Sequence, residues 1–180
     1  MNDSLKEIID KIYFNKEYEY LKDKCKVEIH LPKEIEFTAK LLNLNIIEYL
    51  GEVIPAKKWT FKYPEVIKGE FEASFSTTLL ISKIAPFYYM QHEFEVENKD
   101  ENKLAPTLDG FDGQPYIRSQ YVFQEQVNEV LGNKRYFKLS YAEITEVISE
   151  LSFSEGVTIF GSQVTVEHAI FHDLLGLCNE

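Results

Sequence analysis

The fold is decided by two neighbouring stretches, Phe71-Glu-Ala-Ser-Phe-Ser-Thr-Thr-Leu-Leu-Ile81 and Phe87-Tyr-Tyr-Met-Gln-His-Glu-Phe-Glu-Val-Glu97. In each stretch apolar and polar side chains alternate, which is typical of a strand that buries one of its faces. Only a few residues separate the two stretches. A short connection between two alternating runs predicts an antiparallel hairpin.

The polar face of this hairpin collects carboxylates. With the turn centred near Ile84 and Ala85, the register predicts three cross-strand pairs, namely Glu72 with Glu97, Ser74 with Glu95, and Ser76 with Glu93. Like charges that face each other across a ladder cost stability, so a cation is expected nearby. Either Lys58 and Lys62 of a neighbouring strand supply it, or a basic partner does.

The segments around the hairpin predict an α+β fold. Alternation predicts further strands at 26–31 and 58–63, and helical spacing or capping patterns predict helices at 4–12, 117–131, 140–151 and from 166 onward. Residues 34–50 fit a strand or a buried helix, and the strand is favoured. Residues 98–113 are predicted to form a loop. We therefore expect one domain, 1–180, with antiparallel hairpins in the first 100 residues and terminal helices packed on the sheet.

The charge of the chain is unevenly distributed. The formal net charge is −11, yet residues 1–68 hold 12 lysines and 12 acidic residues, so the whole excess lies in residues 69–180. An acidic surface repels phosphate backbones, which argues against direct nucleic-acid binding. It attracts basic proteins, although the same charge could serve only to keep the protein soluble.

The two cysteines, Cys25 and Cys178, lie far apart and form no CxxC pattern. A disulfide between them stays open, but nothing suggests a disulfide framework, and two scattered thiols fit a reducing compartment. The N-terminal residues do not resemble a signal peptide, and no apolar run approaches the roughly 20 residues that span a bilayer. These observations predict a cytoplasmic location without a membrane partner.

Other patterns carry less chemical meaning. His168 and His172 have the i, i+4 spacing of a zinc pair, but a third ligand is missing from the pattern, and half-buried histidines are the expected interpretation. Asp109-Gly-Phe-Asp-Gly113 lacks the spacing of a calcium loop and predicts turns. Glu97-Asn-Lys99 has the spacing of some nuclease sites in a setting that would repel the substrate. No nucleotide-binding, hydrolase or zinc-finger signature is present, and no cofactor or metal is expected.

These features favour an acidic protein-binding module that neutralises a basic protein. Bacterial immunity proteins against nuclease toxins have this size and charge, an analogy that rests on composition alone. The expected partner-binding residues are Glu70, Glu72, Tyr89, Glu93, Glu95, Glu97, Asp100, Glu101, Asp109 and Asp112. One alternative is an enzyme with a pocket around His92 and Tyr88, and another is a structural or scaffold subunit.

Overall fold

The computed structural model describes residues 3–49, 55–100, 102, 108–153 and 163–178. Its helical elements are α1 (Asp3–Ile9), the π-helical turn η1 (Asp10–Phe14), α2 (Tyr18–Cys25), α3 (Lys33–Leu41), α4 (Arg118–Asn133), α5 (Tyr141–Ile144) and α6 (Val166–Phe171). Its strands are β1 (Asn45–Glu48), β2 (Ala56–Lys62), β3 (Val66–Lys68), β4 (Phe71–Ser82), β5 (Phe87–Asn98), β6 (Leu108–Asp112) and β7 (Phe137–Lys138).

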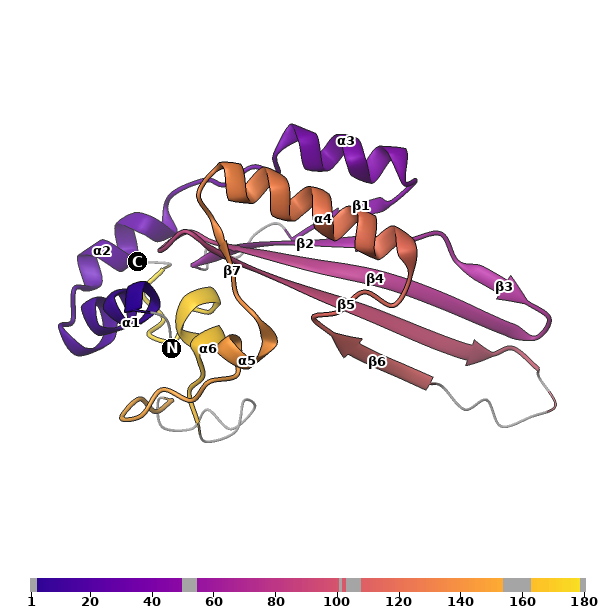
Figure 1. Ribbon diagram of the computed structural model, residues 1–180. Helices are drawn as coiled ribbons and strands as arrows, with labels where there is room; N and C mark the ends of the chain where they lie inside the picture. The colour runs from indigo at the N-terminus through magenta and orange to yellow at the C-terminus, as the bar shows by residue number, and fades with distance from the viewer. Residues whose placement is uncertain (1–2, 50–54, 101, 103–107, 154–162, 179–180) are drawn as a thin grey trace.

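The α+β prediction is confirmed. The strands form one sheet in the order β1-β2-β4-β5-β6, with β3 beside β4 and β7 beside β5 (Figure 1). All pairs are antiparallel except β5 with β7. Strands β4 and β5 are the long central hairpin, and all three predicted cross-strand pairs are present in it.

Helices α3 and α4 cover one face of the sheet (Figure 1). Their buried side chains, among them Ile35 and Phe123, pack on Trp59, Phe61 and Met90 of the sheet. The ring centroids of Phe61 and Phe123 are 4.5 Å apart. Burying an apolar side chain of this size contributes roughly 1.5–3 kcal/mol, so this layer holds the helices firmly on the hairpin.

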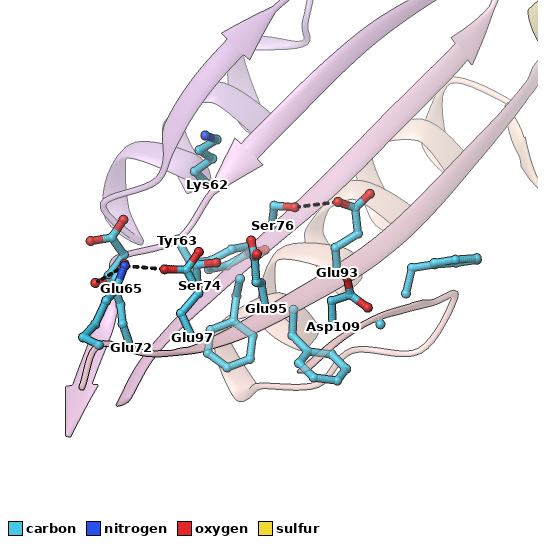
Figure 2. A pocket seen from close by; sticks show the side chains of 15 residues that line it. Lys62, Tyr63, Glu65, Glu72, Ser74, Ser76, Glu93, Glu95, Glu97 and Asp109 are labelled. Carbon is cyan, nitrogen blue, oxygen red and sulfur yellow. Dashed lines mark hydrogen bonds and ion pairs between the residues drawn. The ribbon is translucent and has the colours of Figure 1, made fainter. Parts of the chain in front are cut away.

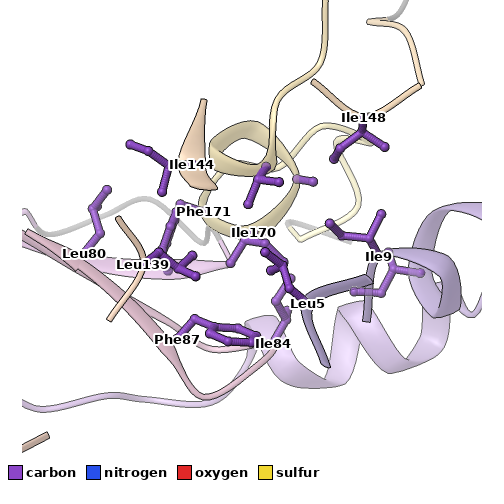
Figure 3. Packing of buried hydrophobic residues seen from close by; sticks show 14 of the residues in the cluster. Leu5, Ile9, Leu80, Ile84, Phe87, Leu139, Ile144, Ile148, Ile170 and Phe171 are labelled. Atoms are coloured by element: carbon purple, nitrogen blue, oxygen red, sulfur yellow. The ribbon is translucent and has the colours of Figure 1, made fainter. Parts of the chain in front are cut away.

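Within the described residues, the opposite face is covered only near the turn of the hairpin. There the N-terminal helices and the C-terminal segment meet in a second apolar cluster, which includes Leu5, Leu80, Phe87, Ile144 and Phe171 (Figure 3). The other end of this face carries no helix of the described chain (Figure 1). One strand surface therefore changes from buried apolar to open and polar along its length.

The sequence left the pairing of the two cysteines open. Cys25, at the end of α2, and Cys178 form a disulfide, with 5.5 Å between their Cα atoms. Both cysteines belong to the apolar cluster where the two ends of the chain pack together. The two cysteines are 153 residues apart in the sequence and meet only through tertiary packing. No local sequence pattern therefore predicts this disulfide.

Several predicted elements also differ. The strand predicted at 26–31 is absent, since these residues belong to no strand of the described chain. The segment 34–50, for which a strand was favoured, is helix α3 followed by the short strand β1 over its described residues 34–49. Ile35 and Ala39 are buried at helical spacing, while Phe37 is 62% exposed. Residues 108–112 form strand β6 instead of turns. The helices at 140 and 166 end early, at Ile144 and Phe171.

None of the helices in the described ranges combines the length and the apolar character needed to cross a membrane.

Candidate functional site

The open end of the sheet forms a hollow of about 690 Å³, which we call the acidic groove (Figure 2). Its floor is the polar face of β4 and β5, and β6 and the segment after β2 form its sides. The carboxylates that line it are Glu65, Glu72, Glu93, Glu95, Glu97 and Asp109. The period of two residues along a strand places the hairpin carboxylates on this one face.

The acidic groove keeps a strong negative charge after its internal ion pairs are counted. Six carboxylates and two lysines line it, a formal charge of −4. Lys99 pairs with Glu97 and lies 3.4 Å from Glu72, so this lysine offsets the facing pair at the end of the hairpin. The two carboxylates in turn raise the pKa of the Lys99 ammonium, led by the hydrogen bond to Glu97, so the cation stays charged.

The prediction that Lys58 and Lys62 supply the cation for the hairpin carboxylates is confirmed only for the position of Lys62. Lys62 lines the acidic groove, but among the described residues no carboxylate lies within ion-pair distance of it. The ammonium of Lys58 lies 4.7 Å from the centre of the Tyr49 ring instead. The cation that the hairpin needs therefore comes chiefly from Lys99, which follows the strand directly.

The middle of the acidic groove has carboxylates without a cation. Glu93 accepts hydrogen bonds from Ser76 Oγ at 3.2 Å and Gln91 Nε2 at 3.1 Å. Glu95 and Asp109 are Cα partners across the β5–β6 ladder. Within the described part of the chain, neither has a hydrogen-bond or ion-pair partner. This facing pair gives the groove two carboxylates without a cation among the described residues.

Gly110 allows β6 to approach the hairpin closely. It is the Cα partner of Phe94, and a Cβ atom at this position would lie 2.7 Å from Phe94 Cε1. A side chain here would therefore require the Phe94 ring, or the strands themselves, to shift. The Asp-Gly sequence, which predicted a turn, instead lies in strand β6, where Asp109 is placed opposite Glu95.

Other predicted partner-binding residues are placed differently. Glu70 is exposed in the turn before β4, where its carbonyl accepts a hydrogen bond from the Lys99 N–H. Asp100 Oδ1 accepts from the Asn102 N–H at 3.0 Å and closes a local turn. Asp112 is the Cα partner of His92, so its side chain lies on the face opposite the acidic groove. Glu101 lies outside the described residues.

Tyr89 is not a surface anchor, contrary to the expectation from the sequence. Its side chain is 2% exposed and belongs to the apolar cluster near the hairpin turn. Strand alternation placed it correctly on the face that also bears Glu93. The alternation could not show that terminal segments cover this end of the face.

His92 and Tyr88, around which a pocket was the alternative expectation, are buried and hydrogen-bonded within the protein. His92 is fully buried, with Nδ1 2.8 Å from Thr77 Oγ1 and Nε2 3.0 Å from Gln124 Oε1. Gln124 Oε1 also accepts from Lys138 Nζ, so the His92 Nε2–H donates and Nδ1 accepts from the Thr77 hydroxyl. Burial, the chief cause, lowers the pKa of His92, which keeps the ring neutral. Tyr88 donates its hydroxyl to Asn128 Oδ1 at 2.9 Å.

His168 and His172, the predicted i, i+4 pair, contact different partners. The His168 Nδ1 accepts a hydrogen bond from the Thr165 N–H at 3.1 Å, which caps α6. The His172 Nε2 lies 3.9 Å from Glu167 Oε1, beyond the end of the helix. In the described part of the chain, no group of three or more His, Cys, Asp or Glu side chains is placed to hold a metal ion.

No known family model matches the chain, and neither a curated protein nor a solved structure is significantly similar to it.

Proposed function

We propose that the protein binds a basic protein through the acidic groove and blocks the basic surface that it covers. The observation that carries this proposal is the gathering of six carboxylates on one open face, of which only Glu72 and Glu97 have a lysine partner among the described residues. A concave surface of one sign focuses the electric field and speeds the encounter with a partner of opposite charge.

Apolar side chains around the same end of the sheet support a protein partner. The large side chains that stay more than half exposed there are Val66, Ile67, Phe71, Leu108 and Phe111. They lie on β3, β6 and the start of β4, and Phe111 lines the groove itself. Interfaces with proteins combine apolar contacts with charge complementarity, whereas a purely solvated acidic surface has no need for such side chains.

Within this proposal, the partner is a nuclease-type toxin and the protein its inhibitor. A nuclease carries a basic surface for the phosphate backbone of its substrate. The facing carboxylates of Glu95 and Asp109 present negative charge that such a surface would bind in place of phosphates. Occupying that surface would exclude nucleic acid without any chemistry at the acidic groove.

A charge-neutral variant of the groove tests the proposal. The triple variant Glu93→Gln, Glu95→Gln, Asp109→Asn removes three negative charges from the groove. The matched control, Glu34→Gln, Glu125→Gln, Glu129→Gln, removes three charges from exposed positions on α3 and α4. Both variants and the unchanged protein are coupled to resin, and native cell extract is applied at low and at high salt.

We expect the unchanged protein and the control variant to retain the same basic protein, with a sequence pI above about 9, at low salt only. The groove variant should not retain it. Purified partner is then titrated against each protein to measure affinity, and nuclease activity is measured with and without the protein. Equal retention by all three proteins, with equal salt dependence, would contradict the proposal.

The Cys25–Cys178 disulfide is relevant to the cellular compartment in which the protein binds its partner. Disulfides persist in oxidising compartments and are rare in the cytoplasm. The cytoplasmic location expected from the sequence depended in part on free thiols, and the Cys25–Cys178 bond removes that support. Trapping thiols at the moment of cell lysis distinguishes the two locations, because a reduced pair fits the cytoplasm and an oxidised pair fits an oxidising compartment.

A further inference from the structure

Strand β6 lies at one margin of the sheet and has an open edge (Figure 1). It pairs with β5 along Leu108–Asp112, and within the described ranges no strand pairs with its other side. All of its residues except Gly110 are exposed. Each residue of a strand carries a backbone donor and acceptor, and alternate residues direct them to opposite edges. The outer edge of β6 can therefore take up one more strand over about 17 Å.

The side chains of β6 give this edge two different faces. Asp109 and Phe111 lie on the side of the acidic groove, which they line. Leu108 and Asp112 lie on the opposite side, since side chains alternate along a strand. Leu108 and Phe111 are 63% and 58% exposed. An added strand would therefore cover large apolar side chains and would also form hydrogen bonds with the free edge.

The charge around the edge selects the kind of strand that pairs with it. A side chain of an added strand that stands opposite Asp109 would lie about 5 Å away, and Glu95 is the next residue across the sheet. Among the described residues, neither carboxylate has a cationic partner. A lysine or arginine at that position would be attracted to both carboxylates, whereas an acidic residue would be repelled.

A second copy of this chain fits the edge poorly. Each copy would bring its own Asp109 and Asp112, and its own acidic groove lined by six carboxylates and two lysines. Like charges across a ladder cost stability, and charged side chains on an edge strand are a common means of preventing self-association. The charge that disfavours a second copy is the same charge that favours a basic segment.

The opposite margin of the sheet does not offer the same site. Its edge strand β1 pairs with β2, which contains Lys57, Lys58 and Lys62 and no acidic residue. Strand β3 on that side is three residues long and includes Lys68. A basic segment is therefore attracted to β6 rather than to β1 or β3.

We infer that an extended, basic segment of the protein partner pairs with the outer edge of β6 and continues the sheet. Its lysine or arginine side chains, at alternate positions, lie on the side of the acidic groove with Asp109, and its apolar side chains lie on the side of Leu108. Backbone hydrogen bonds hold such a segment, and the alternate side chains select it. This inference rests on the proposed function and specifies how the partner is held beside the groove.

The probe is a short capped peptide of alternating lysine and valine, titrated into the intact, oxidised protein at low salt. Hydrogen exchange of the backbone amides is measured by NMR. Amides of alternate residues within Leu108–Asp112 point away from β5. These amides should exchange fast in the free protein, and their exchange should slow at least about tenfold at saturation with the peptide. No binding of the peptide, or binding without added protection in β6, would overturn the inference.

Two N-methylated forms of the peptide separate strand pairing from simple attraction of charge. One form is methylated on the lysine amides and the other on the valine amides, so each loses backbone donors along one edge only, and both keep the full charge. The form that keeps the donors directed at β6 should bind like the parent peptide, and the other should bind at least about tenfold more weakly. Equal binding of the two forms would mean that charge alone attracts the peptide, which contradicts the inference.

A pair of protein variants locates the peptide. Phe111→Ala removes an apolar contact at the edge, and Phe37→Ala on α3 is the matched control, because the two side chains are 58% and 62% exposed. The β6 variant should bind the peptide about tenfold more weakly, and the α3 variant should bind it like the unchanged protein. Equal affinities of the two variants would place the peptide elsewhere.

The two proposals can fail separately. If the two methylated peptides bind alike but the double variant Glu95→Gln, Asp109→Asn loses the protein partner, the acidic groove stands and pairing at β6 falls. If only one methylated peptide binds while that double variant keeps the protein partner, the groove proposal falls and β6 remains a site for an added strand.

Discussion

Neutralising Glu95 should make the protein more stable. Glu95 and Asp109 are Cα partners across the β5–β6 ladder and have no cationic partner among the described residues. Directly opposite side chains have Cβ atoms about 5 Å apart, and two unit charges at that distance repel by roughly 0.8 kcal/mol in water. Exposure to solvent and salt reduces this, so we expect Glu95→Gln to raise the free energy of unfolding by about 0.5 kcal/mol.

A double-mutant cycle measures this repulsion. Urea unfolding is followed for Glu95→Gln, Asp109→Asn and the double variant at low salt. Each single variant removes the whole repulsion between the two carboxylates. The double variant should therefore gain no more unfolding free energy than either single variant. The differences should vanish near 1 M salt, where the screening length is about 3 Å.

The neighbouring pair is the matched control. Glu72 and Glu97 are also Cα partners, but Lys99 contacts both carboxylates. Glu97→Gln should therefore not raise stability. If Glu95→Gln lowers the stability, or if Glu97→Gln stabilises as much as Glu95→Gln does, the uncompensated charge that we assign to the acidic groove is absent.

Three further predictions concern the scaffold. Because burial lowers the pKa of His92, the unfolded state binds its proton more readily; stability should fall as the pH drops below the ordinary histidine pKa of about 6.5, and His92→Gln should flatten this part of the pH–stability curve. Gly110→Ala should lower the free energy of unfolding by about 1–3 kcal/mol, measured in urea, because the new methyl group meets the Phe94 ring, and Phe94→Leu should restore part of the loss. Cys178→Ser should cost about 2–5 kcal/mol, and a reductant should lower the melting temperature of the unchanged protein but not of the variant.

The sequence predicts the central hairpin well because apolar and polar side chains alternate along the whole of both strands. Alternation over 12 residues in each strand fixes which side chains share a face, and the short turn then fixes the register. Alternation and register together are therefore enough to place Glu93 and Glu95 on one face of the sheet. Asp109 joins them through a strand that the sequence does not suggest, since an Asp-Gly pair usually marks a turn.

Other features depend on tertiary contacts that no local pattern contains. Tyr89 and Glu93 share one strand face, yet terminal segments bury Tyr89 and leave the acidic end open. Helix α3 has an alternating sequence because Phe37 is apolar but exposed, which imitates a strand. The partners of Lys99 and Cys178 likewise follow from packing and from the course of the chain.

Binding through the acidic groove is measured most directly by the affinity of the purified basic partner for two double variants of equal charge. One is Glu95→Gln, Asp109→Asn in the acidic groove, and the other is Glu125→Gln, Glu129→Gln on α4. We expect the groove variant to bind at least about tenfold more weakly and to lose salt dependence, while the α4 variant binds like the unchanged protein. Equal affinities for the two variants across the salt range would contradict this expectation.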